Sequence, residues 1–139
     1  MIRYLAAYAG TAIVMVVLDV LWLGFIARPL YLQGIGHLMA EKAHVPVAVL
    51  FYAVFALGLV LLAVSPAGPA PGWPRTLTTA ALFGFFAYAT YDLTNLATLK
   101  GWSPGVALLD LAWGAVVTGM SATAGFLVTR TVLQPGAMS

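Results

Sequence analysis

The stretch YLAAYAGTAIVMVVLDVLWLGF, residues 4–25, decides the fold of this chain. Asp19 is the one charged residue among these apolar and small residues. A helix needs about 20 predominantly apolar residues to cross the hydrocarbon core of a bilayer, which is about 30 Å thick. The stretch therefore predicts a membrane-spanning helix. Because it is longer than the apolar core of a signal peptide, about 7–15 residues, we expect it to stay in the mature protein.

The composition of the whole chain agrees with a membrane protein. Hydrophobic residues make up 63% of its 139 residues and charged residues 7%, whereas soluble domains average about 45–50% and about 25%. A small soluble protein could not bury so much apolar surface. The net charge of +2 is too weak for nucleic-acid binding. The absence of cysteine excludes disulfides and Cys-ligated metals.

Three further apolar stretches follow the first. The predicted spans cover about residues 4–25, 45–64, 76–98 and 105–127. Pro29 closes the first span, since its ring cannot continue the helical hydrogen bonds, and a Pro/Gly-rich segment, residues 65–72, separates the second from the third. We predict an all-α membrane protein, an up-down bundle of four transmembrane helices that forms a single domain over residues 1–139.

The connection between the first two spans, residues 26–44, is the longest. Its apolar residues recur at near-helical spacing, which predicts a short amphipathic helix lying in the membrane interface. The loop also holds His37, Glu41 and His44. Loop histidines are more often solvated than ligands, and whether these three residues join a site is left open.

Membrane orientation follows weakly from charge. Four spans place both termini and the second loop on one side, called side A, and the first and third loops on the other, called side B. Lys and Arg number three on each side, so the positive-inside rule gives a tie. Arg3 beside the amino terminus favours cytoplasmic termini, because the first helix usually dominates.

Three of the four acidic residues fall inside the predicted spans: Asp19, Asp92 and Asp110. Each lies about six residues from the side-B end of its span, roughly 9 Å deep at 1.5 Å per residue. Tyr52 lies at the same level in the second span. Because ionisable groups in the membrane almost always face the bundle interior, we expect the carboxylates to share one layer, within reach of one another.

Aromatic and amide neighbours accompany the aspartates. Tyr88 and Asn95 lie four and three residues from Asp92, on its helical face, and Tyr91 precedes it. A Trp follows three residues after Asp in both the first and the fourth span, where its ring can form the wall of a pocket. We predict that the substrate-binding residues are Trp22, Tyr52, Tyr88, Tyr91, Asn95 and Trp113.

Several of these residues lie in motifs that resemble a known family. The motifs are Asp19-Val20-Leu21-Trp22-Leu23-Gly24, Phe51-Tyr52, Tyr91-Asp92-Leu93-Thr94-Asn95-Leu96-Ala97-Thr98 followed by Trp102, and Asp110-Leu111-Ala112-Trp113-Gly114. Over nearly its whole length, the chain resembles the bacterial membrane proteins grouped as domain of unknown function 2177. The resemblance implies a multi-pass protein of the bacterial inner membrane and supplies no activity.

The leading functional hypothesis is a lipid-associated membrane enzyme with Asp19, Asp92 and Asp110 as catalytic carboxylates. Carboxylates suit hard divalent cations such as Mg²⁺, Mn²⁺ or Ca²⁺, and an ion held by the three aspartates could orient a phosphate headgroup. Without a metal, a protonated carboxyl beside an ionised one would supply a general acid and a general base. The expected partner is a membrane lipid.

Two other functions stay open. Intramembrane carboxylates also mark ion and proton pathways, and four helices are few for such a path, so this function would need a homo-oligomer. The third hypothesis is a structural or assembly role, because Asp and Asn can hydrogen-bond across helices for about 0.6 kcal/mol per contact. Three aspartates at one depth argue against a purely structural role, since Ser or Thr would cost less there.

Overall fold

The computed structural model describes residues 1–64 and 72–133, and its regular elements are all helical. Helix α1 (Ile2–Leu21) continues as the π-helical segment η1 (Trp22–Ile26), and α2 (Arg28–Ile35) leads into a short 3-10 turn, η2 (Gly36–Leu38). Helix α3 (Val45–Leu59) continues as the π-helical segment η3 (Val60–Val64). The long helices α4 (Trp73–Thr98) and α5 (Pro104–Leu133) follow. The predicted all-α class is confirmed.

Three of these segments are long and apolar enough to cross a membrane. They are Ile2–Ile26, Val45–Val64 and Pro104–Val132. Helix α4 has 26 residues, but threonines, tyrosines, Asp92 and Asn95 lower its mean hydropathy. The finding agrees with an all-α membrane protein, and the fourth span stays a prediction.

Prolines determine where most helices begin. Pro29, Pro46 and Pro74 each occupy the first turn of α2, α3 and α4, and Pro104 begins α5. Proline suits the first turn because its missing N–H would have no helical partner there. At the start of α5 the Ser103 hydroxyl also accepts a hydrogen bond from the Val106 N–H at 3.3 Å.

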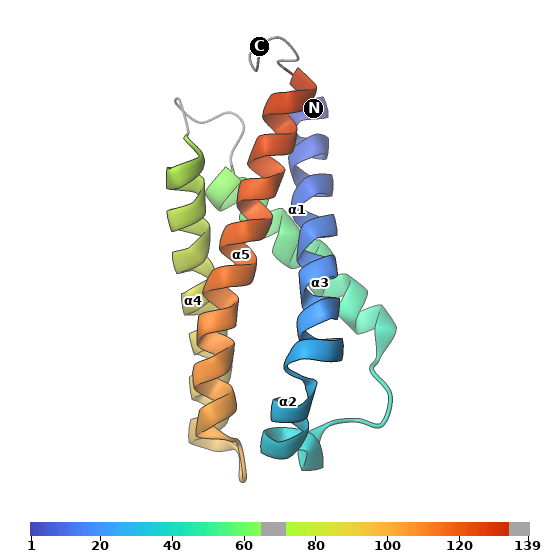
Figure 1. The fold of residues 1–139 in the computed structure, drawn as a ribbon, viewed down its shortest axis with the longest axis vertical. Helices are drawn as coiled ribbons and strands as arrows, with labels where there is room; N and C mark the ends of the chain where they lie inside the picture. The colour runs from blue at the N-terminus through green and yellow to red at the C-terminus, as the bar shows by residue number, and fades with distance from the viewer. Residues whose placement is uncertain (65–71, 134–139) are drawn as a thin grey trace.

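Helix α5 is the centre of the bundle and packs along both α1 and α4. Figure 1 shows these three helices side by side, with the start of α1 and the end of α5 at the same end, side A. Glycines allow the close approach: Gly84 of α4 meets Gly114 and Thr118 of α5, and Gly10 of α1 meets Gly125 of α5. Small residues bring transmembrane helices together in this way because their backbones can touch.

Helix α3 crosses the other helices obliquely (Figure 1). It packs on α1, where the Tyr8 hydroxyl donates to the Ala53 carbonyl at 3.0 Å, and only its continuation η3 packs closely on α4 and α5. The first half of α3 therefore diverges from the second half of α4. Aromatic side chains bridge the two helices, with Phe55 and Phe83 ring centroids 5.5 Å apart.

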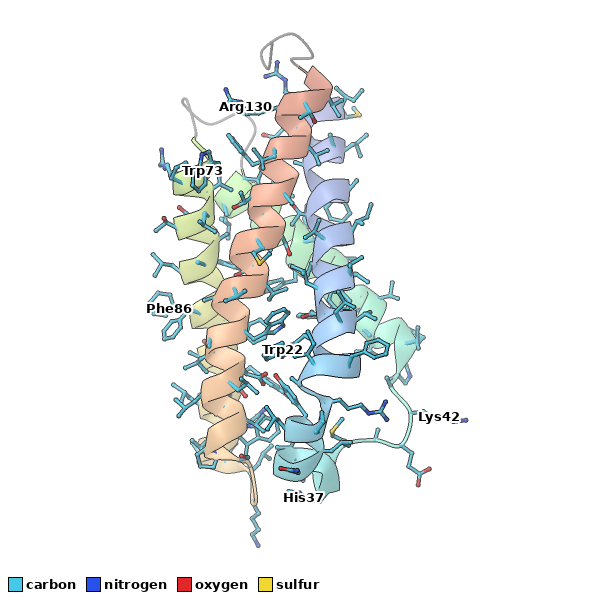
Figure 2. All side chains as sticks on the ribbon, in the orientation of Figure 1. Trp22, His37, Lys42, Trp73, Phe86 and Arg130 are labelled. Atoms are coloured by element: carbon cyan, nitrogen blue, oxygen red, sulfur yellow. The ribbon has the colours of Figure 1, made fainter. Side chains whose placement is uncertain are left out.

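Helix α2 and the turn that joins α4 to α5 lie at the opposite end, side B. In Figure 2, His37 and Lys42 lie near this end, whereas Trp73 and Arg130 lie near side A. A helix was predicted within residues 26–44, and α2 is that helix. One face of α2 is buried against the start of α5, in a cluster of Ala27, Tyr31, Ile35, Trp102, Val106 and Ala107.

Candidate functional site

A pocket of about 550 Å³ lies in the side-B half of the bundle. Parts of α1, η1, α2, α3, α4 and α5 form its walls, and its size falls within the range of about 300–1,000 Å³ that is typical of small-molecule sites. The lining is mostly aromatic, with two carboxylates: Asp19, Tyr31, Phe51, Tyr52, Phe55, Tyr88, Tyr91, Asp110 and Trp113. Leu23, Ile35, Ala48 and Ala87 complete it.

Both carboxylate oxygens of Asp19 are occupied. The Tyr52 hydroxyl of α3 donates to Oδ2 at 2.8 Å, and the Trp113 indole N–H of α5 donates to Oδ1 at 2.8 Å. The side chain is buried, with 3% of its surface exposed. Asp19 therefore joins three helices at the pocket wall.

Asp110 is held on one oxygen only. The Tyr31 hydroxyl of α2 donates a hydrogen bond to Oδ1, and the Trp22 indole N–H donates to the Tyr31 oxygen at 3.3 Å. Asp110 is 7% exposed. Its Oδ2 has no donor within residues 1–64 and 72–133 and is not sealed in the interior, and Asp110 lines the pocket.

The Asp-x-x-Trp pattern occurs in α1 and in α5, and the Trp of each pattern supports the Asp of the other. Trp22 and Trp113 stack with ring centroids 4.3 Å apart and planes 5° from parallel. Trp113 bonds Asp19 directly, while Trp22 reaches Asp110 through the Tyr31 hydroxyl. Each motif thus supplies the indole that supports the carboxylate of the other.

Asp92 does not join the pocket. It is fully buried on the face of α4 that meets α5, and neither of its oxygens has a hydrogen-bond partner in the described part of the chain. The buried Trp102 indole N–H lies near enough to influence the Asp92 carboxylate, but it has no acceptor at hydrogen-bond distance there. The Trp102 ring packs edge-on against Tyr91, with centroids 5.6 Å apart.

The three aspartates therefore do not form the shared metal centre considered from the sequence. In the two described ranges, no three His, Asp or Glu side chains lie close enough together to hold a metal ion. The cause is the direction of each side chain around its helix axis. Asp92 belongs to the α5-facing side of α4 with Gly84, whereas Asp110 reaches towards α2.

The comparison with protein families agrees with the membrane architecture. A family model described as "Predicted membrane protein (DUF2177)" matches residues 4–127. The chain belongs to the DUF2177 family. The match includes every pocket-lining residue of this DUF2177 protein. No curated protein matches the chain, and no solved structure matches it.

The predicted substrate-binding residues divide into two groups in this DUF2177 protein. Tyr52, Tyr88, Tyr91 and Trp113 line the pocket; Trp22 stacks behind Trp113, and Asn95 is not part of the lining. His37, Glu41 and His44 are exposed and do not line the pocket either. Contact with a substrate stays a prediction for all of them.

Sequence reasoning missed Tyr31, which anchors Asp110. Tyr31 and Ile35 are four residues apart on the buried face of α2. That spacing was visible in the sequence, but it indicated only an interfacial helix. Nothing in the pattern showed that this face packs on the start of α5 and reaches an aspartate 79 residues later.

Proposed function

We propose that this DUF2177 protein is a membrane enzyme that holds a lipid-like amphiphile in the pocket and acts on its polar group through Asp110. The observation that carries the proposal is the unbonded Oδ2 of Asp110 at the wall of an aromatic pocket. A carboxylate fixed on one oxygen and free on the other can take a proton from a bound group within hydrogen-bond reach. Tyr31 supplies that fixation.

Asp19 has a positioning role in this proposal. Both of its oxygens already accept a hydrogen bond from a neighbouring helix, so less of its acceptor capacity is left for a ligand than at Asp110. It instead fixes Tyr52 and Trp113, which line the pocket. The structural hypothesis raised from the sequence therefore suits Asp19, while the chemical hypothesis suits Asp110.

The lining of the pocket favours an amphiphile over a water-soluble ligand. Apart from the two carboxylates, Trp113 and the tyrosine hydroxyls, the lining side chains are hydrocarbon: Leu23, Ile35, Ala48, Phe51, Phe55 and Ala87. Helices α3 and α4 pack loosely on each other beside this half of the bundle, and in this proposal an apolar chain enters from the lipid on that side. Pockets with a mostly apolar wall and a few polar groups orient ligands by those groups.

The proposal includes four membrane spans, with α4 as the additional one. At 1.5 Å per residue a helix of this length measures about 39 Å, enough to cross a bilayer. Three of its exposed threonines satisfy their own hydroxyls: Thr78, Thr90 and Thr98 each donate to the carbonyl four residues earlier, at 2.8, 2.8 and 2.7 Å. This bonding lowers the cost of placing hydroxyls in lipid.

A comparison of membrane lipids tests the proposed enzyme. Cells that express the wild-type protein, the Asp110→Asn variant or no protein are extracted, and their lipids are compared by mass spectrometry. We expect a lipid change that requires the wild-type protein and is lost with Asp110→Asn at equal protein level. Glu41→Gln is the matched control, because Glu41 is exposed and outside the pocket. A change retained by Asp110→Asn would rule out Asp110 as the proton acceptor.

A further inference from the structure

We propose that the polar group of the ligand is a cation, a protonated amine carried on an apolar chain. This inference rests on the proposed function, that the pocket holds an amphiphile. It adds the chemical class of that amphiphile, and three features of the pocket support it: its charge, its aromatic wall and the free oxygen of Asp110.

The charged residues in the described lining of the pocket are both acidic. Asp19 and Asp110 line it, and the described lining contains no Lys, Arg or His. A phosphate or carboxylate headgroup would face carboxylates with no basic partner, and like charges brought together in a low dielectric repel strongly. A cation instead compensates a buried carboxylate, which is costly inside a membrane when it is unpaired.

The aromatic wall favours a cation further. Tyr52, Tyr88 and Trp113 line the same pocket as both carboxylates. Cations are attracted to the faces of aromatic rings, and cages of such rings bind quaternary ammonium groups. Two of these rings are held in place: Trp113 stacks on Trp22 and bonds Asp19, and Tyr52 also bonds Asp19. Rigid walls reduce the entropy lost on binding.

The free oxygen of Asp110 supplies the contact that defines position. Asp110 is more than nine-tenths buried, and its Oδ2 has no donor in the described part of the chain. A protonated amine donates to such an oxygen and also carries the opposite charge. Hydrogen bonds to charged groups contribute about twice as much as neutral ones, so an amine binds there more tightly than an alcohol of the same chain length.

Three probes with one chain length separate the ligand classes. Purified protein in a non-ionic detergent is titrated with dodecylamine, dodecanol and dodecanoate, and heats of binding are measured. We expect dodecylamine to bind at least about tenfold more tightly than dodecanol, the size of one charge-assisted hydrogen bond, and dodecanoate to bind most weakly. Asp110→Asn should remove most of the preference for the amine while dodecanol binding changes little.

Variants that fill the pocket distinguish binding there from partition into the detergent. Ala87→Phe fills it from α4 and Ala48→Phe from α3, so the control survives if one variant fails to fold. Equal binding of dodecanol and dodecylamine, or tightest binding of dodecanoate, would overturn the cationic class and leave the amphiphile proposal standing. If no probe binds the wild type better than the filled variants, the amphiphile proposal fails as well.

Discussion

Asp19 and Asp110 have the same side chain and line the same pocket, yet their hydrogen-bond partners differ. Asp19 accepts hydrogen bonds on both oxygens, and Asp110 on one. The sequence predicted that both would face the interior, because an ionisable group is costly in lipid. It could not predict which donors each would meet, since each donor comes from another helix than the aspartate it bonds: Tyr31 from α2, Tyr52 from α3 and Trp113 from α5.

Removing the Asp19 carboxylate should destabilise the protein. Asp19→Ala leaves the Tyr52 hydroxyl and the Trp113 N–H without their acceptor, and a buried unpaired donor costs about 1–3 kcal/mol. We expect a clear fall in the melting temperature of the purified protein in detergent, read by thermal unfolding. Tyr4→Phe is the matched control, because Tyr4 is exposed and its hydroxyl has no hydrogen bond within the described ranges 1–64 and 72–133. Equal melting of Asp19→Ala and the wild type would contradict the two bonds.

Replacing the Asp92 carboxylate should have the opposite effect and stabilise the protein. Its carboxylate is fully buried and has no hydrogen-bond partner in the described residues. Asp92→Asn removes the ionisable group with almost no change in volume, but its amide keeps unpaired polar atoms, so we expect stability to rise by only part of the about 1–3 kcal/mol that an unsatisfied buried group costs. The measurement is again thermal unfolding in detergent. A lower melting temperature would mean that the carboxylate has a bound partner in the membrane.

At the scale of the helices, hydrophobic length and proline position were enough to place most elements. The second predicted span, residues 45–64, has the same range as α3 with η3, and Pro104 lies at the start of α5. Depth along a helix follows from the rise per residue, so the level of the aspartates could be estimated. The rotation of each helix about its axis depends on packing between helices, and this is why Asp92 and Asp110 face different neighbours.

Close packing between α4 and α5 gives a prediction at this scale. A Cβ at Gly84 would overlap the Gly114 carbonyl oxygen and the Thr118 side chain, so Gly84→Ala must push the helices apart. Overpacking of this kind costs about 1–3 kcal/mol, and we expect a lower melting temperature. Gly24→Ala is the control, because in the described part of the chain no other side chain and no backbone of another helix lies within 4 Å of a Cβ there. If both variants melt alike, the α4–α5 contact is looser than described.

At the scale of the whole molecule, the path of the chain through the membrane can be measured with single cysteines, because the sequence contains none. Lys42→Cys and Lys100→Cys should react with a membrane-impermeant maleimide from one side, and Trp73→Cys and Thr131→Cys from the other. These four residues are exposed near the ends of the helices. Reaction of Trp73→Cys and Lys100→Cys from the same side would show that α4 does not span.

In the proposed arrangement, the position of the pocket along the bundle decides which leaflet of the membrane supplies its ligand. It lies wholly in the side-B half, beside the divergence of α3 and α4. In the proposed four-span arrangement it draws its ligand from a single leaflet. A molecule in the opposite leaflet must first flip across the bilayer to reach Asp110. The protein would therefore respond to the composition of one leaflet rather than to the total lipid content, and a flippase could control it without touching it.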